Sequence, residues 1–486
     1  MRTSPAADTV RRLADQGHLI GDGWTRDDGG GTYEHRYPAT GEGQARVGLA
    51  GAGAVDTAVA AARAAQPAWA ALAPLKRAAV LFRLADLLEG IRPEAAELAA
   101  LDNGTPVSVM NPGAYASAWV RYYAGWCDKL DGEVRSGDPG LSSVRVEPYG
   151  VIAVIPPWNG SMMGMGQKCG PALAAGNAVV AKPPEVAPFG MLRFAELALE
   201  AGLPPGVLNV VVGGAGTGAA LAGHPGVDKI SFTGGGATAR TLMATAAANL
   251  TPLALELGGK SPNIVFPDAD LDRAATTACM GTALLSGQGC ALPTRLYVHD
   301  DVYDQVVARV VSTLASFTVG DPLDPATFVG PVVTEAAMER ILATVGRARS
   351  DGAELLAGGG RLGGELAAGW FVEPTVFGEV DHHSDLARNE VFGPVQAILR
   401  FRSDDEVLEQ ANDSPFGLAA YLHTADLGRI QRFTRELAAG TVAVNGMGRV
   451  SPATPFGGVK QSGFGREGGR AGLEEMVRRK TVFIAP

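Results

Sequence analysis

The chain has 486 residues, of which 46% are hydrophobic and 19% charged, and its formal net charge is −10. This length exceeds what one hydrophobic core holds and predicts roughly two or three domains. The negative charge argues against nucleic acid as a main partner, because phosphate binding requires a positive surface. No run approaches the roughly 18 apolar residues of a membrane span, and residues 1–20 lack the apolar segment of a signal peptide. We therefore expect neither a membrane partner nor export.

Cysteine and histidine usage indicates a reducing, cytoplasmic setting without a metal site. The four cysteines form no CxxC pair: Cys127, Cys169, Cys279 and Cys290. Such sparse cysteines predict neither a disulfide framework nor a zinc site. The only neighbouring histidines are His382 and His383. Adjacent side chains rarely face one ion, so we interpret this pair as loop residues.

The first 125 residues are rich in helix-forming residues. Alanine-loaded periodic stretches predict long covering helices at 54–72 and 75–103. Glycines at 29–31 and 358–364 predict surface turns.

From Gly150 onward, short apolar runs rich in β-branched residues alternate with helical stretches, and each ends at Gly or Pro. We expect helices at 161–175 and 191–201, and strands at 150–155, 178–182, 208–212 and 229–233. A second series extends from about 261 to 445, with a strand at 295–298 and a helix at 303–317. This alternation predicts an α/β fold with parallel sheets covered by helices on both faces. Ligands of such sheets bind beyond the carboxyl ends of the strands.

Three chemically distinctive residues lie in separate glycine- or proline-rich motifs. Cys290 follows Gly287-Gln288-Gly289, and Glu256 stands 34 residues upstream in Leu255-Glu256-Leu257-Gly258-Gly259-Lys260. Asn159 ends Ile155-Pro156-Pro157-Trp158-Asn159. A nucleophile, a carboxylate and an amide donor are what the covalent oxidation of an aldehyde needs.

Each of the three has a chemical role and a structural alternative. A thiolate of Cys290 could attack the aldehyde carbon, and small neighbours such as Gly287 and Gly289 would let the substrate approach. The other three cysteines are interpreted as buried structural residues. Glu256 follows an apolar strand, where burial raises its affinity for protons as a base requires; a helix cap or salt bridge is the alternative. Asn159 could stabilise an oxyanion together with the backbone N–H of Cys290, or simply end a strand in a turn.

Together these motifs resemble the aldehyde dehydrogenase superfamily of the NAD(P)-dependent, non-acylating type, over about residues 21–481. The resemblance implies a Rossmann-type parallel-sheet cofactor domain, a second α/β catalytic domain, a small β oligomerisation element and a homodimer or homotetramer. The implied boundaries are 1–125 and 149–257 for the NAD(P)-binding domain, 258–455 for the catalytic domain, and 126–148 with 456–486 for oligomerisation. It also implies that Lys168 belongs to a proton relay; a solvated lysine is the alternative.

The resemblance locates the cofactor in several segments. Lys182 and Glu185, in Lys182-Pro183-Pro184-Glu185, match the adenosine-ribose site. Glu185 would accept a hydrogen bond from the 2′-hydroxyl and repel a 2′-phosphate, which favours NAD and leaves NADP possible. Glu390 would hold the nicotinamide ribose, and Phe392 would pack by its ring. The remaining expected cofactor contacts are Ile155, Pro156, Trp158, Gly214, Phe232, Thr233, Gly234, Gly235 and Leu257.

The pyrophosphate turn departs from the family pattern. Gly235 stands where relatives commonly carry a hydroxyl residue, and Ala239 stands where they carry glycine. Loss of the hydroxyl removes one contact to the pyrophosphate, which puts tight cofactor binding in question.

The segment after Asn159 predicts the substrate. Many relatives place an aromatic residue there, whereas this chain has Gly160, Ser161, Met162, Met163 and Met165. The methionines either pack the helix or line a roomy funnel for an apolar aldehyde, to which Leu292 and Val450 could contribute. Two rival functions stay open. A coenzyme A-acylating relative is disfavoured by Glu256, and a non-catalytic relative is kept open by the altered phosphate turn.

Overall fold

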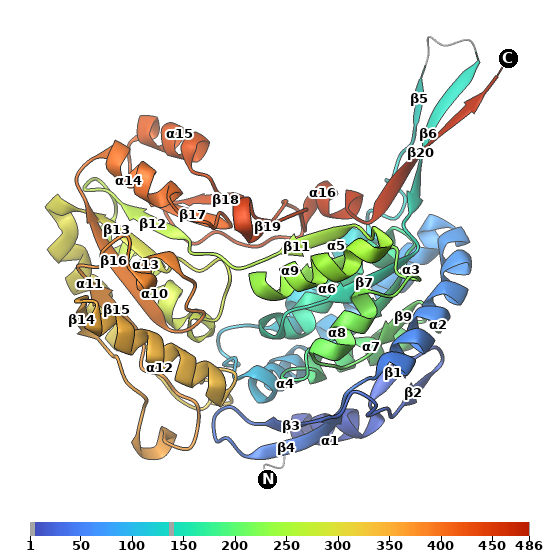
Figure 1. Ribbon diagram of the computed structural model, residues 1–486, viewed down its shortest axis with the longest axis horizontal. Coiled ribbons are helices and arrows are strands. Elements are labelled where there is room, and N and C mark those ends of the chain that lie inside the picture. The colour runs from blue at the N-terminus through green and yellow to red at the C-terminus, as the bar shows by residue number, and fades with distance from the viewer. Residues whose placement is uncertain (1–4, 136–139, 486) are drawn as a thin grey trace.

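The computed structural model describes residues 5–135 and 140–485 (Figure 1). It contains two large sheets covered by helices, and a three-stranded ribbon that projects from one side. Residues 1–4 of the expected cofactor domain, 136–139 of the expected projecting element and residue 486 lie outside the described residues.

The first large sheet has eight strands in the order β19-β11-β10-β7-β8-β9-β1-β2. Its central strands are parallel: β7 (Val151–Ile155), β8 (Ala178–Ala181), β9 (Leu208–Val210), β10 (Lys229–Thr233) and β11 (Leu253–Glu256). Antiparallel strands close both edges: β1 (His18–Ile20) and β2 (Gly23–Thr25) at one, β19 (Gly463–Phe464) at the other. The four strands expected between 150 and 233 are thus present within two residues of their predicted bounds.

Helices cover both faces of this sheet, as predicted. Ile152 and Val154 of β7 belong to one hydrophobic cluster, and Val151, Ala153 and Ile155 belong to another. The first cluster contains residues of α3 (Pro74–Gly90), α5 (Pro112–Ala124), α6 (Ser161–Ala174) and α7 (Phe189–Glu200). The second contains residues of α2 (Ala52–Ala71), α8 (Ala215–Ala222) and α9 (Gly236–Ala246). Alternate side chains therefore point to opposite helical layers, which explains the continuous apolar runs.

The N-terminal region differs from expectation in one place. The helix expected at 75–103 is two helices, α3 and α4 (Arg92–Asn103), which are separated at Ile91. Pro93 lies in the first turn of α4, where a backbone N–H has no partner within the helix and its absence breaks no hydrogen bond. Within a continuous helix the proline ring would clash with the preceding turn. The region also contains α1 (Pro5–Gln16) and a hairpin of β3 (Thr32–Arg36) and β4 (Gly43–Gly48), which had no clear signal in the sequence.

The second large sheet has seven strands in the order β14-β15-β16-β13-β12-β17-β18. All its pairs are parallel except β14 with β15. Its strands are β12 (Pro262–Val265), β13 (Arg295–His299), β14 (Glu354–Ala357), β15 (Thr375–Gly378), β16 (Val395–Phe401), β17 (Ala419–His423) and β18 (Thr441–Val444). Its helices are α10 (Leu271–Ala283), α11 (Tyr303–Ala315), α12 (Glu335–Ser350), α13 (Asp385–Arg388), α14 (Asp404–Asn412) and α15 (Leu427–Glu436). The expected strand at 295–298 and the helix after it are both present.

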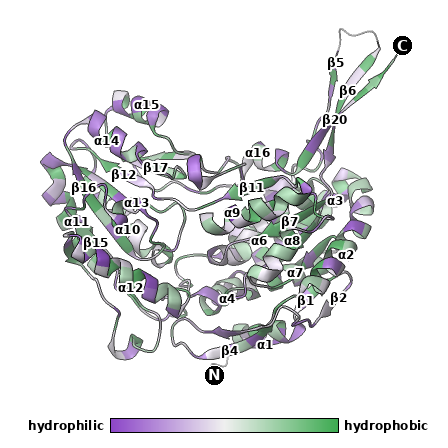
Figure 2. Cartoon of the chain, viewed as in Figure 1, coloured by the Kyte–Doolittle hydropathy of each residue, from purple (hydrophilic) through white to green (hydrophobic). Residues whose placement is uncertain are grey.

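The projecting ribbon consists of β5 (Glu133–Arg135), β6 (Leu141–Pro148) and β20 (Val477–Ile484), and α16 (Gly469–Glu474) precedes β20 (Figure 1). Figure 2 shows hydrophobic residues on this ribbon although it stands away from both sheets. Val134, Leu141, Phe483 and Ile484 are exposed there. Within the described residues, no helix is both long and apolar enough to cross a membrane.

Candidate active site

Cys290 lies in a tightly turned loop between a short 3₁₀ segment (Leu284–Gly287) and β13. Three successive residues, Leu285, Ser286 and Gly287, have positive φ angles of 53°, 54° and 71°. A Cβ atom on Gly287 would stand 2.0 Å from the carbonyl oxygen of Gly393. Gly287 is therefore required for this close backbone contact, and its role in the access of the substrate to sulfur stays a prediction.

Glu256 is the last residue of β11, and its side chain is buried with no partner. Only 4% of the residue is exposed, and neither carboxylate oxygen has a hydrogen-bond partner among the described residues. A Cβ atom on Gly457 would lie 2.6 Å from Oε1, so the carboxyl packs against that backbone. Burial raises the pKa of Glu256 to about 9, and the charge of Glu467 adds to the increase. Among the described residues Glu256 therefore caps no helix and forms no salt bridge, and its raised pKa means that the ionised carboxylate binds a proton strongly.

The electrostatic environment of Cys290 links it to two carboxyl groups. Burial raises the pKa of the Cys290 thiol to about 12, and the charges of Glu390 and Glu256 raise it further. The thiol is therefore protonated at neutral pH in the described protein. A nearby base must accept its proton before sulfur can attack.

Asn159 follows β7 in a short 3₁₀ turn (Trp158–Gly160), and its side chain contacts the Cys290 loop. Nδ2 donates a hydrogen bond to the carbonyl oxygen of Gln288 at 2.8 Å. The turn is held from behind by Asn103, whose Nδ2 donates to the carbonyl of Trp158 at 3.0 Å. A carboxamide has two N–H donors, so one N–H of Asn159 is left for a substrate oxygen. This contact opposes the interpretation of Asn159 as only a strand-ending turn.

Lys168 is a buried member of an ion pair, and the solvated-lysine alternative is wrong. Only 2% of it is exposed. Nζ donates to Oε1 of Glu467 at 2.5 Å and to Oγ of Ser231 at 3.1 Å. Glu467 was not among the predicted site residues, because its motif Ser462–Glu467 indicates only turns and an interface. Nothing in the sequence links it to a lysine 299 residues away.

Lys182 and Glu185 lie together beyond the carboxyl end of β8. Nζ of Lys182 donates to the carbonyl of Gly213 at 2.6 Å, and burial lowers the pKa of this lysine to about 8. A Cβ atom on Gly214 would lie 3.2 Å from Oε1 of Glu185. A cation and a carboxylate thus face the N-terminus of α8. This donor and acceptor set matches the hydroxyl groups of a ribose.

The turn from Thr233 to Gly235 leaves open space at the N-terminus of α9. Gly235 is the N-cap residue, and a Cβ atom there would meet nothing within 4 Å. The hydroxyl of Thr233 is buried without a partner among the described residues. Two helix N-termini, of α8 after β9 and of α9 after β10, therefore lie beyond strand ends of the same sheet, a favourable place for phosphate groups. Ala239 belongs to the hydrophobic core, so its methyl group does not disturb this space.

Glu390 covers the turn after Glu256. Its Oε1 accepts a hydrogen bond from the backbone N–H of Gly259 at 3.1 Å, and a Cβ atom on Gly258 would stand 2.2 Å from Oε2. Burial raises the pKa of Glu390. Phe392 packs edge-to-face on Trp158, with ring centroids 5.6 Å apart. Predicted cofactor residues from distant segments thus lie beyond the carboxyl ends of strands in the first large sheet. Four other predicted contacts are buried: Ile155, Phe232 and Leu257 in the hydrophobic core, and Pro156 next to Ile155.

The residues after Asn159 do not line a funnel as a group. Met162 and Met165 are buried in the first hydrophobic cluster, where α6 packs against its neighbours, and Gly160 and Ser161 are also buried. Only Met163 is half-buried on another side of the helix. Of the other expected contributors, Leu292 is buried and Val450 is exposed.

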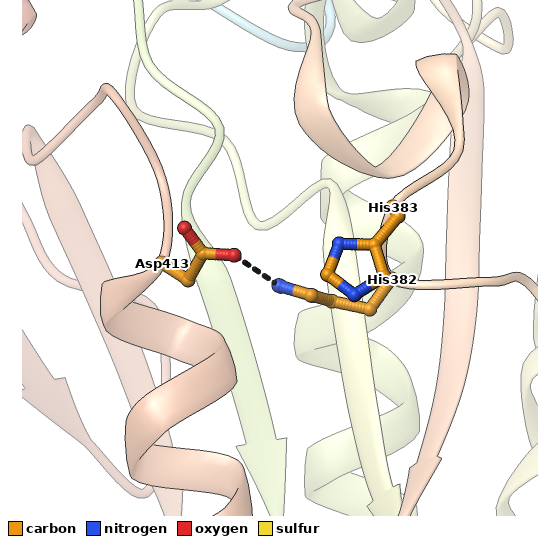
Figure 3. A group of neighbouring side chains, drawn as sticks. All are labelled: His382, His383 and Asp413. Carbon is orange, nitrogen blue, oxygen red and sulfur yellow. Dashed lines mark hydrogen bonds and ion pairs between the residues drawn. The ribbon is translucent and has the colours of Figure 1, made fainter.

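His382, His383 and Asp413 form a surface cluster whose ligand atoms lie within 4.8 Å of one another (Figure 3). Oδ2 of Asp413 lies 3.0 Å from His382 Nε2 and accepts from Arg388 Nη1 at 2.8 Å. Nδ1 of His382 faces the hydroxyl of Tyr297 at 3.2 Å. The guanidinium beside the carboxylate would repel a metal ion, so this cluster fits an ion-pair network better. That the protein needs no metal stays a prediction.

An α/β fold with a half-buried cysteine, a buried carboxyl and two helix N-termini at the strand ends has the architecture of a nucleotide-dependent enzyme. The profile of the aldehyde dehydrogenase family matches residues 24–482. Betaine aldehyde dehydrogenase of Rhizobium leguminosarum bv. trifolii is 41% identical over 472 residues, which cover 96% of each protein. Betaine aldehyde dehydrogenase of Cereibacter sphaeroides is 40% identical over 487 residues, covering 100% of this chain and 98% of that protein.

Solved structures agree with these relatives. The NAD+ complex of aldehyde dehydrogenase from Bacillus cereus superposes with a TM-score of 0.95 at 37% identity, over 100% of this chain and 99% of that one. The chain belongs to the aldehyde dehydrogenase family. The predicted family, fold and enzyme class, an oxidoreductase that acts on aldehydes with NAD(P), are thereby confirmed.

Proposed function

We propose that this protein oxidises an aldehyde to a carboxylic acid through a covalent intermediate on Cys290. Sulfur adds to the carbonyl carbon as the thiol proton passes to a base, and the thiohemiacetal forms. Bound NAD(P) supplies the hydride acceptor, and loss of hydride leaves a thioester on Cys290. Glu256 then takes a proton from water, whose oxygen attacks the thioester and releases the acid and the thiol. The buried, unpartnered carboxyl of Glu256, close enough to influence Cys290, is the observation that carries this proposal.

The same proposal gives Lys168 and Glu467 the task of moving protons. They form a buried ion pair whose charges both act on Glu256. A proton taken up by Glu256 needs a route out, because its carboxyl has no partner and little exposure. Lys168 on α6 and Glu467 in the loop before α16 are the next titratable groups to which this proton can pass.

Asn159 is proposed as the donor to the developing oxyanion. Asn159→Ala is expected to lower kcat about 10²- to 10³-fold, because one preorganised amide donor contributes that much in comparable sites. The affinity for NAD should change little. Asn249→Ala is the matched control, since its Nδ2 also donates to a backbone carbonyl, that of Gly223 at 2.7 Å, but on an exposed surface. Steady-state kinetics measure kcat, and NAD titration measures the affinity for NAD. Equal kcat for the two variants would contradict the role of Asn159 as oxyanion donor.

NAD is proposed as the preferred cofactor because of Glu185. The carboxylate beside Gly214 would repel a 2′-phosphate. Glu185→Gln is expected to tighten NADP binding about tenfold or more while altering NAD binding much less, since it removes one like-charge contact. Fluorescence titration with both cofactors tests this, with Glu200→Gln on the far end of α7 as the control. Unchanged NADP affinity in Glu185→Gln would show that this carboxylate does not select the cofactor.

The substrate is proposed to be an uncharged, apolar aldehyde. The curated relatives act on betaine aldehyde by name, and a quaternary ammonium group is best held by aromatic faces. Residues 160–168, which follow the oxyanion donor, contain no aromatic ring, and Met163 is the half-buried apolar side chain among them. Reduced-cofactor absorbance with betaine aldehyde and with aliphatic aldehydes of similar length compares the two classes. A higher kcat/KM for betaine aldehyde would overturn this choice, and stimulation by coenzyme A would favour the acylating rival.

The projecting ribbon is proposed to join subunits into a homodimer or homotetramer. Its exposed apolar side chains have nothing to pack on within the described chain. We further propose a reducing, cytoplasmic setting, because Cys290 must stay a free thiol and all four cysteines are free.

A further inference from the structure

Gln167 stands next to Lys168 on α6, and both side chains bind the same carboxylate. Nε2 of Gln167 donates to Oε2 of Glu467, and Nζ of Lys168 donates to Oε1. Glu467 is therefore held at both oxygens by consecutive residues of one helix. Gln167 is half-buried and Glu467 is buried, so water replaces these bonds poorly.

The segment that holds this carboxylate packs on Glu256: the backbones of Phe456 and Glu467 form an antiparallel bridge, and a Cβ atom on the next residue, Gly457, would lie 2.6 Å from Oε1 of Glu256. Burial is the largest cause of the raised pKa of Glu256, and because this carboxyl has no hydrogen-bond partner among the described residues, the surrounding charges adjust its ionisation further. Glu467 is the largest of these charges that disfavour ionisation, and Lys168 opposes it. Where Glu467 sits relative to Glu256 thus decides how readily the base loses its proton.

We propose that Gln167 is a positioning residue for the base: its amide holds Glu467 in place beside Glu256. This rests on the proposed role of Glu256 in thioester hydrolysis. Gln167 touches neither reacting sulfur nor Glu256 through a hydrogen bond of its own. It acts through the carboxylate that it fixes.

The field at Glu256 comes from titratable groups on every element packed around it. They are Lys168 of α6, Cys290 of the loop before β13, Arg466 and Glu467 of the loop before α16, and Glu475 after α16. Gln167→Leu removes the amide and releases one side of Glu467, which lets its charge move from Glu256 toward water. Gln167→Glu places a second carboxylate in the same position. The two variants therefore change the field at Glu256 in opposite directions.

The test is the pH dependence of thioester hydrolysis, followed in single turnovers after the burst of reduced cofactor. The acid limb should move to lower pH in Gln167→Leu and to higher pH in Gln167→Glu, by about one unit, the order expected when one charge moves beside a buried carboxyl. The rate of hydride transfer should change less than the rate of hydrolysis. Gln410→Leu and Gln410→Glu are matched controls, because half-buried Gln410 also donates to a carboxylate, Oε1 of Glu406 at 3.5 Å, far from the site.

A purely structural role predicts another pattern. If both Gln167 variants lose burst amplitude in parallel and keep the wild-type acid limb, or if both limbs move in the same direction, the positioning role is overturned. Failure of the underlying function is distinct, since wild-type protein would then show neither burst nor turnover with any aldehyde. If a Gln167 variant fails to fold, Gln167→Asn replaces it in the test. Its amide is the same, but the shorter side chain no longer spans the distance to Glu467. An acid limb displaced in the direction expected for Gln167→Leu supports the proposal, and an unmoved limb contradicts it.

Discussion

Replacement of Cys290 by alanine is expected to abolish aldehyde oxidation and to leave cofactor binding intact. Without the sulfur atom neither the thiohemiacetal nor the thioester can form, so turnover should fall by about 10⁴-fold or more, as it does when a covalent nucleophile is removed. Lys182, Glu185 and Gly235, which are proposed to hold the cofactor, lie in the turns after β8 and β10, away from the Cys290 loop in the chain. Their geometry does not depend on the thiol. Reduced-cofactor absorbance and NAD titration of the same preparation measure both properties.

Cys127→Ala is the matched control for this result. Cys127 is also a free cysteine; it is buried, and its Sγ donates to the carbonyl oxygen of Tyr123 at 3.9 Å. It should retain wild-type turnover. Appreciable activity in Cys290→Ala, or equal losses in both variants, would contradict the covalent role of Cys290.

Glu256→Gln should separate the two halves of the reaction. Removing the base slows proton transfer from water by about 10²- to 10⁴-fold. Hydride transfer precedes that step, so one equivalent of reduced cofactor should still appear in a burst, followed by nearly no turnover. Rapid-mixing absorbance distinguishes burst from steady state. Loss of the burst together with turnover would show that Glu256 is needed before the thioester forms.

The same variant should be more stable than the wild type at alkaline pH. Burial raises the pKa of Glu256 from 4.5 to about 9 in the folded protein, so the unfolded chain ionises first. Wild-type stability attributable to this group is complete below pH 4.5 and is lost as pH rises toward the folded value. Glutamine does not ionise, so the Tm advantage of Glu256→Gln should be absent near pH 4 and present near about pH 8. An advantage independent of pH would refute this assignment.

The main elements of the fold could be predicted from local sequence signals. Apolar runs closed by Gly or Pro indicated β7 to β10, because buried parallel strands need apolar residues on both faces. Asn159, Lys182 and Gly234 each follow the carboxyl end of a strand, where ligands of parallel sheets bind. The break before Pro93 was not predicted, because the periodic alanines on both sides suggested one helix.

Side-chain orientation and long-range partners could not be read in the same way. Met162 and Met165 differ from Met163 only in the side of α6 that meets its neighbours. The pair of Lys168 with Glu467 joins residues 299 apart, and its location depends on how the loop before α16 packs. Likewise, Gly287 is constrained by the backbone of Gly393, a contact that no local motif reveals.

The most direct test of the account is the intact mass of Glu256→Gln after mixing with NAD and an aldehyde that the wild type oxidises. The account predicts that the protein gains the mass of the acyl group, and that peptide mapping finds this group on Cys290 as a hydroxylamine-sensitive thioester. The adduct should be absent without NAD, because hydride loss must precede the thioester. An unmodified Cys290, with reduced cofactor formed in the same sample, would contradict the covalent mechanism.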